Sequence, residues 1–226
     1  MRFLREDRAA AEHAIAKAIC DGLADNKRVL WLVSGGSNIT LEKSIMDMLH
    51  DHAEDRLASL AILPTDERYG PSGHTDSNVR QLRDLGFDPG AATFVDVLMH
   101  NTSLEQTVSF YSDVAATALA NAGIVVGEFG MGADGHVIGI KPDSPAVETD
   151  DSTVTGYKWN DFTRLTLMPL ALRQVTTGFL VAYGNEKREA LEHLQKRDKP
   201  FSKLPVTVLY ELPEVCVFND QIESET

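Results

Sequence analysis

Residues 124–136 read IVVGEFGMGADGH, an apolar run that predicts a buried strand, followed at once by a glycine-rich turn. The turn matches the G-x-G-x-x-G pattern of a dinucleotide-binding loop. Such a loop must run straight into a helix, because the pyrophosphate rests on the N-terminus of that helix. Here Pro142 and Pro145 follow within ten residues of Gly135, and HVIGI (136–140) is β-branched and interrupted by a glycine. No helix of useful length fits, so the pattern does not predict a nucleotide loop.

Similar apolar runs occur on both sides of this strand along the chain. They predict further buried strands at VLWLV (29–33), LAIL (60–63), TFVDVL (93–98), GFLVAY (178–183) and VCVF (215–218). Apolar residues at helical spacing predict helices over 7–25, around Leu41 to Leu49, and over 79–85, 104–121 and 185–197. Residues 152–168 are expected to be extended, with strands at TVTGY and RLTL. Buried strands that alternate with amphipathic helices predict one α/β domain, with an open parallel sheet covered by helices on both faces.

The charge and composition exclude several classes of protein. The 226 residues carry a net charge of −13, whereas non-specific nucleic-acid binding needs a basic surface. No window approaches the roughly 18 apolar residues of a membrane span, and the N-terminus, MRFLREDRAA, lacks the apolar segment of a secretory signal. Cys20 and Cys216 are too few for a disulfide framework and have no metal-like or redox spacing. We therefore expect a cytoplasmic protein that binds neither nucleic acid nor a membrane.

Three loops that follow predicted strands are rich in glycine and polar residues, and ligands of parallel sheets bind at the carboxyl ends of the strands. The first loop is SGGSN (34–38). Its glycines, Gly35 and Gly36, let the backbone approach a ligand, and Ser34 and Ser37 add hydroxyl donors. The following helix would add free N–H groups, which makes the loop a candidate phosphate cradle. The alternative is a tight turn with a serine N-cap, and the G-K-[ST] ending of a Walker loop is missing.

The second loop is TDERYGPSGHTDSN (65–78), which follows LAIL directly. Arg68 can form a bidentate bond with a phosphate, while Asp66 or Glu67 can bind sugar hydroxyls or orient a neighbour. The alternative is a solvated charged loop.

The third loop is the GMGADGH turn, whose glycines place Asp134 and His136 at the end of a strand. An aspartate beside an imidazole fixes its tautomer and raises its basicity, as suits a general base that works near neutral pH. This favours a catalytic pair over the alternative of a structural or surface histidine. No second His, Cys or acidic ligand follows at a ligand-like spacing, so no metal is expected.

The order of these loops is SGGS, then DER with SN some ten residues on, then GMGxDGH. It resembles that of the 6-phosphogluconolactonase and glucosamine-6-phosphate deaminase family. The resemblance continues through PDSPA (142–146), RLTL (164–167), GFLVAYGNEKREAL (178–191) and VCVFND (215–220), and so covers nearly the whole chain.

The resemblance implies a Rossmann-like three-layer α/β/α sandwich with a mostly parallel sheet. It implies a single domain over residues 1–226, in which we expect 219–226 to be a frayed acidic tail. It also implies a small-molecule sugar phosphate as partner, no metal or organic cofactor, and a monomer or weak homodimer.

The resemblance assigns roles within these loops. The histidine of GMGxDGH, here His136, acts in the lactonases as the base that activates water, and Asp134 would orient it or bind sugar hydroxyls. Other contacts to the phosphate or the rest of the substrate are expected from the SGGS loop, the DER segment and a basic group near the R-[IVL]-T-L strand: Ser34, Gly35, Gly36, Ser37, Asp66, Arg68, and the two candidates Lys158 and Arg164.

The residues after the histidine separate the two activities of the family. The sequences of deaminases resemble GHIAFNEP at this place, whereas this chain has GHVIGIKP. Lys141 stands at the position of the glutamate, and a lysine cannot do the work of that acid. Lactonases resemble GHTASLFP, so Val137, Ile138, Gly139 and Lys141 depart from that pattern too. The resemblance implies hydrolysis of 6-phospho-D-glucono-1,5-lactone to 6-phosphogluconate, the second step of the oxidative pentose phosphate pathway. The alternatives are a sugar-phosphate-binding protein without catalysis and, less favoured, an amino-sugar-phosphate deaminase or isomerase.

Overall fold

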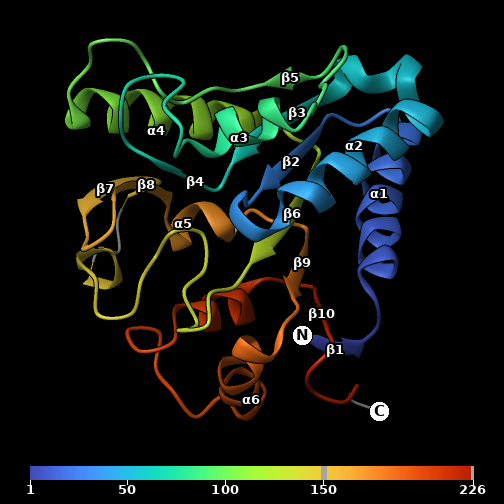
Figure 1. Ribbon diagram of the computed structural model, residues 1–226. Helices are drawn as coiled ribbons and strands as arrows, with labels where there is room; N and C mark the ends of the chain where they lie inside the picture. The colour runs from blue at the N-terminus through green and yellow to red at the C-terminus, as the bar shows by residue number, and fades with distance from the viewer. Residues whose placement is uncertain (149–151, 225–226) are drawn as a thin grey trace.

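The computed structural model describes residues 1–148 and 152–224 (Figure 1). A seven-stranded sheet forms the centre of the fold, and its neighbouring strands are parallel. Its strands follow the order β1 (Arg2–Arg5), β10 (Val215–Asn219), β9 (Thr177–Ala182), β6 (Ile124–Gly130), β2 (Val29–Val33), β3 (Leu60–Pro64) and β5 (Thr93–Phe94). A smaller antiparallel sheet has the order β4 (Asp66–Arg68), β8 (Thr163–Leu167) and β7 (Val154–Lys158). The helices are α1 (Arg8–Ala24), α2 (Ile39–Ala53), α3 (Asn78–Asp84), α4 (Leu104–Asn121), α5 (Pro169–Leu172) and α6 (Arg188–Lys196).

Successive side chains of a strand point to opposite sides of the sheet. In the central strands, the side chains on both sides are buried. In β2, Trp31 and Val33 pack into the core that contains α1 and α2, whereas Leu30 and Leu32 pack into the core that contains α4. Figure 1 shows α1 and α2 together on one side of the sheet and α4 on the other. The structure therefore confirms the predicted three-layer α/β/α arrangement with a mostly parallel sheet.

Side-chain caps fix where several helices begin. Asp7 accepts the backbone N–H of Ala10 at the start of α1, at 2.9 Å. Ser103 and Gln106 form a reciprocal capping box at the start of α4. None of the helices that the structure describes is long and apolar enough to cross a membrane.

The predicted strands at 29–33, 60–63, 124–129, 178–183 and 215–218 are confirmed, as are those at TVTGY and RLTL. The strand predicted at 93–98 is wrong beyond Phe94. The side chain of Asp96 accepts the N–H of Leu98 (3.1 Å) in a turn that takes the chain out of the sheet. Strand β1 has no apolar run and is not predicted, yet it pairs with β10, so VCVF lies inside the sheet rather than at its edge.

Two other segments differ from the expectation. The loop at 64–78 contains strand β4, which pairs antiparallel with β8 so that Arg68 lies opposite Arg164. The helix expected over 185–197 begins as a 3₁₀ turn at Asn185–Lys187 and continues as α6.

Residues 219–224 are not frayed, contrary to the expectation for the tail. Asn219 is buried at the end of β10, and its side-chain oxygen accepts the N–H of Ile222 at 2.7 Å. The side chain of Ile222 is buried as well. Ser224 accepts the N–H of Arg5 from β1 at 2.9 Å. These contacts hold the segment against the edge of the sheet; residues 225 and 226 lie outside the described ranges.

Candidate active site

A polar cleft of about 300 Å³ opens at the carboxyl ends of the central strands. The SGGS loop after β2, the DER segment of β4 and the GMGADGH turn after β6 all contribute to its walls. The turn between β7 and β8 and the residue Lys187 after β9 complete it. The three loops that the sequence analysis singles out therefore meet in one place, as expected for an open parallel sheet.

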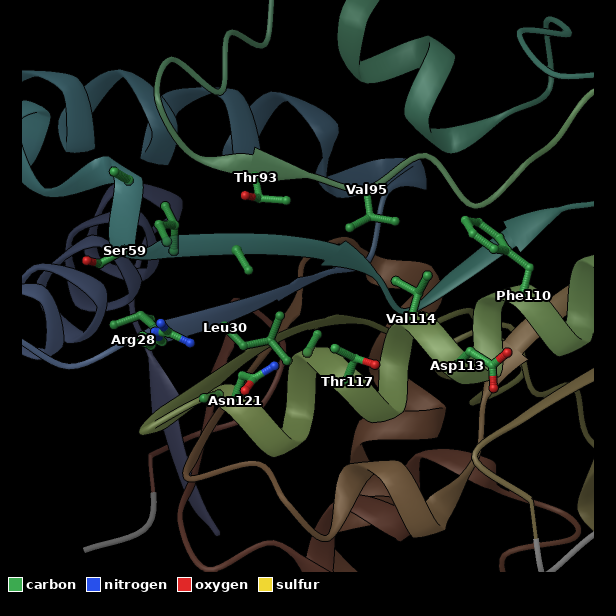
Figure 2. Close-up of a pocket in the computed structure, with 16 residues that line it drawn as sticks. Arg28, Leu30, Ser59, Thr93, Val95, Phe110, Asp113, Val114, Thr117 and Asn121 are labelled. Atoms are coloured by element: carbon green, nitrogen blue, oxygen red, sulfur yellow. The ribbon is translucent and has the colours of Figure 1, made fainter.

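A larger cavity, of about 630 Å³, lies at the opposite ends of β2 and β3, against α4. Figure 2 shows Leu30 and Val114 in this cavity, with Arg28 at one end and Asp113 at the other. Its walls are mainly apolar, and the described residues that line it include no histidine, cysteine or tyrosine. Convergent titratable groups, rather than size, mark a catalytic site, so the polar cleft is the candidate.

The hydrogen bonds of the GMGADGH turn fix the position of His136, which lines the cleft. The N–H of Gly132 donates to the carbonyl of His136 (2.9 Å), and the N–H of Gly135 donates to the carbonyl of Gly132 (3.0 Å). A Cβ atom on Gly132 would lie 1.9 Å from Nδ1 of His136, so the imidazole can occupy this position only beside a glycine. Residues 131–144 form turns and bridges rather than a helix, which confirms that the pattern is not a nucleotide loop.

His136 and Asp134 form a hydrogen-bonded pair. Nδ1 of His136 lies 2.5 Å from Oδ1 of Asp134, and no described residue bonds Nε2. When Nδ1 donates to Asp134, the lone pair of Nε2 is free to take a proton in the cleft. Burial lowers the pKa of His136, and the Lys141 and Arg164 cations lower it further, against the opposite effect of Asp134. His136 therefore stays a neutral base to a lower pH than an ordinary histidine does.

The SGGS loop lies above two buried carboxylates. Glu128 accepts the N–H and the hydroxyl of Ser34 (3.0 and 2.9 Å), and Glu42 accepts the N–H of Gly35 (2.6 Å). The donors of Ser34 and Gly35 thus face the interior rather than the cleft. The next two N–H groups and the Ser37 hydroxyl make no bond to the described residues, so they remain as donors for an anion.

Glu42 and Glu128 form a carboxyl pair that the sequence pattern does not predict. Both are fully buried, and burial raises the pKa of each. The charge of Glu128 and the hydrogen bond with it raise the pKa of Glu42 further. Oε2 of Glu42 meets no N–H or hydroxyl group in the described structure. The pair is therefore best satisfied when Glu42 keeps a proton, because two adjacent buried carboxylates cannot both ionise without a large cost.

Glu42→Gln is expected to raise the free energy of unfolding, and the gain should grow with pH. The folded protein keeps a proton that the unfolded chain releases above its glutamate pKa of about 4.3. Wild-type stability consequently falls as the pH rises above that value, by at most about 1.4 kcal/mol per pH unit for one proton. A neutral amide removes this dependence. Urea unfolding at about pH 5 and about pH 8 measures it, with the exposed Glu214→Gln as control. A gain of the same size at both pH values would contradict the retained proton.

The DER segment divides its side chains between the cleft and the interior, because it forms strand β4. Asp66 lines the cleft, and burial raises its pKa to about 6 against the lowering effect of Arg164. Glu67 points inward and accepts the N–H of Asn78 (2.8 Å) and the hydroxyl of Ser77 (2.9 Å). Glu67 thus fixes the start of α3 and holds Asn78 at the edge of the cleft.

Two arginines flank the ring of Phe162 at the cleft. The guanidinium of Arg68 lies 5.0 Å from the ring centroid, and that of Arg164 lies 5.6 Å from it. Arg164 is held by Asp161 at 2.7 Å and lies 3.8 Å from Asp66. The Nε atoms of both arginines are buried and make no bond to the described residues. They leave directed N–H donors of the kind that bind a phosphate or carboxylate.

Of the two candidate basic groups near β8, the structure brings Arg164 to the cleft and leaves Lys158 outside it. Lys158 is exposed at the end of β7 and does not line the cleft. Side chains of a strand alternate between its faces, and in β7 the inward position belongs to Tyr157, which is buried.

Several residues that line the cleft have no role in the sequence analysis, among them Asn78, Phe162 and Lys187. Asn78 has a buried, unpartnered Oδ1. The SN that ends the second loop is the sequence feature that could have pointed to it. The side chain of Lys187 is 14% exposed. Lys187 ends the 3₁₀ turn Asn185–Lys187 that follows β9, and its place after a strand is the signal that could have found it. Phe162 lies in the β7–β8 turn, and no pattern points to it.

The charges of the cleft differ in sign from those of the whole chain. Its walls carry the cations of Arg68, Lys141, Arg164 and Lys187 but only the acids Asp66 and Asp161, although the net charge of the chain is −13. Within residues 1–148 and 152–224, no three His, Cys, Asp or Glu side chains gather to hold a metal ion. A neutral base with a free Nε2 among cations can deprotonate water next to an anionic ligand.

Comparison with known proteins agrees with this description. The model of the family glucosamine-6-phosphate isomerases/6-phosphogluconolactonase matches residues 6–216. A 6-phosphogluconolactonase from Pseudomonas aeruginosa is 27% identical over 150 residues, which are 62% of this chain and 60% of that protein. The match therefore spans less than two thirds of the length of this relative.

Solved structures share the fold over almost the whole chain. A 6-phosphogluconolactonase from Shewanella baltica OS155 has a TM-score of 0.77 at 21% identity, over 96% of both chains. A monomeric glucosamine-6-phosphate deaminase has a TM-score of 0.78 at 17% identity, over 97% of both chains. Because the family model matches nearly all of the sequence, the chain belongs to the glucosamine-6-phosphate isomerase/6-phosphogluconolactonase family.

Proposed function

We propose that the chain is an enzyme that hydrolyses 6-phospho-D-glucono-1,5-lactone to 6-phosphogluconate. The observation that carries the proposal is a histidine with a free Nε2 and an aspartate on Nδ1, in one cleft with two arginines that have unpartnered N–H groups. The family of the chain and the name of its Pseudomonas relative support the same reaction.

In this proposal, Nε2 of His136 takes a proton from a water molecule while the water oxygen bonds to C1 of the lactone. The carbonyl oxygen becomes an oxyanion, which the cations of the cleft stabilise. The tetrahedral intermediate then loses its bond between C1 and the ring oxygen, and His136 returns its proton to that oxygen. The acid formed ionises in water. Atoms and charge balance without a protein nucleophile or a redox partner.

The proposed ligand contacts follow the donors that the loops leave available. We assign the phosphate to the N–H groups of Gly36 and Ser37 together with Arg68 and Arg164. Asp66 is assigned to the sugar hydroxyls, because a carboxyl beside an arginine accepts hydrogen bonds well. In this assignment Ser34 and Gly35 shape the loop, and Lys158 has no part.

The test is the formation of 6-phosphogluconate from lactone generated in situ, with the spontaneous opening of the lactone subtracted. Wild-type protein is expected to raise the rate well above that of heat-denatured protein. Glucono-1,5-lactone without the phosphate should react much more slowly, because it lacks the group that the arginines bind. A wild-type rate equal to the spontaneous rate would contradict the proposal.

The same samples test both alternatives. Release of ammonia from glucosamine 6-phosphate reports deamination. We expect none, because Lys141 occupies the position of the glutamate in the deaminase-like pattern GHIAFNEP. Binding of 6-phosphogluconate by a protein that does not raise the lactone rate would favour the non-catalytic alternative.

A further inference from the structure

Lys141, which departs from the family pattern, lies in contact with the His136–Asp134 pair. Its Nζ atom is 2.9 Å from Nδ1 of His136 and 3.3 Å from Oδ2 of Asp134. The same Nδ1 atom is 2.5 Å from Oδ1 of Asp134. The Lys141 side chain is 15% exposed and lines the cleft. Two side chains of opposite charge therefore compete for one nitrogen.

The two contacts require opposite states of the imidazole. A carboxylate can only accept a hydrogen bond, so the Asp134 contact needs the proton on Nδ1. An ammonium can only donate, so the Lys141 contact needs a bare Nδ1 and places the proton on Nε2 of the neutral ring. The first tautomer leaves Nε2 free as a base, and the second has no free lone pair on the cleft side. Only one of the two contacts can be a hydrogen bond at a time.

The backbone around Lys141 is held in place, whereas its ammonium is not. The Lys141 N–H donates to the hydroxyl of Tyr157 (3.2 Å), which itself donates to the carbonyl of Gly139 (2.5 Å). Thr166 donates to the carbonyl of Ile138, which has a positive φ of 48°, uncommon for a β-branched residue. The four-carbon side chain can still rotate, so its ammonium can turn from Nδ1 toward an acceptor in the cleft.

We propose that Lys141 is a positioning residue that couples ligand binding to formation of the base. In the empty cleft its ammonium competes with Asp134 and stabilises the tautomer with the proton on Nε2. An anionic or carbonyl oxygen of a sugar acid or lactone draws the ammonium away. A proton then leaves Nε2 and another enters Nδ1 through water, with no change in net charge, and Asp134 holds the productive tautomer. The coupling rests on the proposed function, because it takes His136 as the base.

The groups around the imidazole agree in direction with this competition. Burial lowers the pKa of His136, Asp134 raises it, and Lys141 and Arg164 lower it. Arg164 is itself paired with Asp161 at 2.7 Å and lies 3.8 Å from Asp66, so both carboxylates offset part of its charge. Removal of the Lys141 charge should therefore raise the pKa of His136, whereas Lys141→Arg should keep it low.

The test is NMR of the full chain with ¹⁵N-labelled histidine, because the imidazole nitrogen shifts distinguish the two tautomers. His136→Asn identifies the His136 signals among those of the seven histidines. Wild type without ligand is expected to show a population with the proton on Nε2, and Lys141→Met should lose it. Lys17→Met, an exposed lysine change on α1, should match wild type. Saturating wild type with 6-phosphogluconate should produce the same loss as Lys141→Met.

An unchanged tautomer ratio in Lys141→Met would overturn the inference, as would an unchanged ratio in wild type saturated with 6-phosphogluconate. Lys141→Arg is the second variant, and it should retain the wild-type ratio because it retains the cation. The readout does not depend on turnover. A tautomer change without lactone hydrolysis would reject the proposed function alone, and hydrolysis without a tautomer change would reject this inference alone.

Discussion

Gly132→Ala is expected to remove nearly all lactone hydrolysis while leaving the protein folded. A Cβ atom at this position would lie 1.9 Å from Nδ1 and 2.1 Å from Cε1 of His136, and 2.6 Å from Oδ1 of Asp134. The imidazole must therefore leave its position and lose its contact with Asp134. General-base catalysis contributes about 10²- to 10⁴-fold to a rate, and a displaced base forfeits most of that factor.

The expected loss lies in kcat, because the substitution leaves unchanged the cations to which we assign the phosphate. Gly123→Ala is the matched control. It is the same chemical change before β6, and its Cβ atom would meet Lys27 at an ordinary 3.4 Å. The control should keep wild-type activity, and both variants should unfold at similar urea concentrations. Gly132→Ala with wild-type kcat would show that the observed position of His136 is not the catalytic one.

Arg68→Ala is expected to raise KM for the phosphorylated lactone about 10- to 100-fold, with a smaller effect on kcat. A hydrogen bond to a charged group contributes about 1.5–3 kcal/mol, and each 1.4 kcal/mol is a factor of ten in affinity. The buried Nε of Arg68 makes no bond to the described residues, so a phosphate would be its partner. Kinetics with the phosphorylated and the unphosphorylated lactone measure the effect, and only the phosphorylated substrate should respond.

Arg83→Ala is the control for this prediction. Arg83 also lies over a phenylalanine ring, that of Phe94 at 5.8 Å, and pairs with Asp96, but it does not line the cleft. Arg68→Lys keeps the charge without the forked donors and should recover part of the affinity. An equal loss for both lactones in Arg68→Ala would place Arg68 outside the phosphate contacts.

The architecture could be predicted from sequence wherever the signal is local. The central strands can be predicted because both of their faces are buried. Their sequences are therefore continuous apolar runs such as VLWLV. Strand β1 has no such run, since RFLR pairs only along one edge, and its partner β10 is more than 200 residues away in the chain. The residues after Phe94 look like a strand in composition, but a side-chain turn at Asp96 removes them from the sheet.

The loops of the site could be predicted because ligands of an open parallel sheet bind at the carboxyl ends of its strands, where these loops lie. The choice between Lys158 and Arg164 could not, because it depends on which face of the small sheet turns toward the cleft. The inward direction of the Ser34 and Gly35 N–H groups could not be predicted either. These groups donate to Glu128 of strand β6 and to Glu42 of helix α2. Such pairings are set by the tertiary structure.

The most direct test of the account compares wild type and His136→Ala in the hydrolysis of 6-phosphogluconolactone generated in situ. The account predicts a wild-type rate well above spontaneous opening, and a kcat about 10²- to 10⁴-fold lower in the variant, at a similar KM. Hydrolysis by His136→Ala at the wild-type rate would contradict the role of the His136–Asp134 pair. A wild-type rate equal to spontaneous opening would contradict the lactonase function itself.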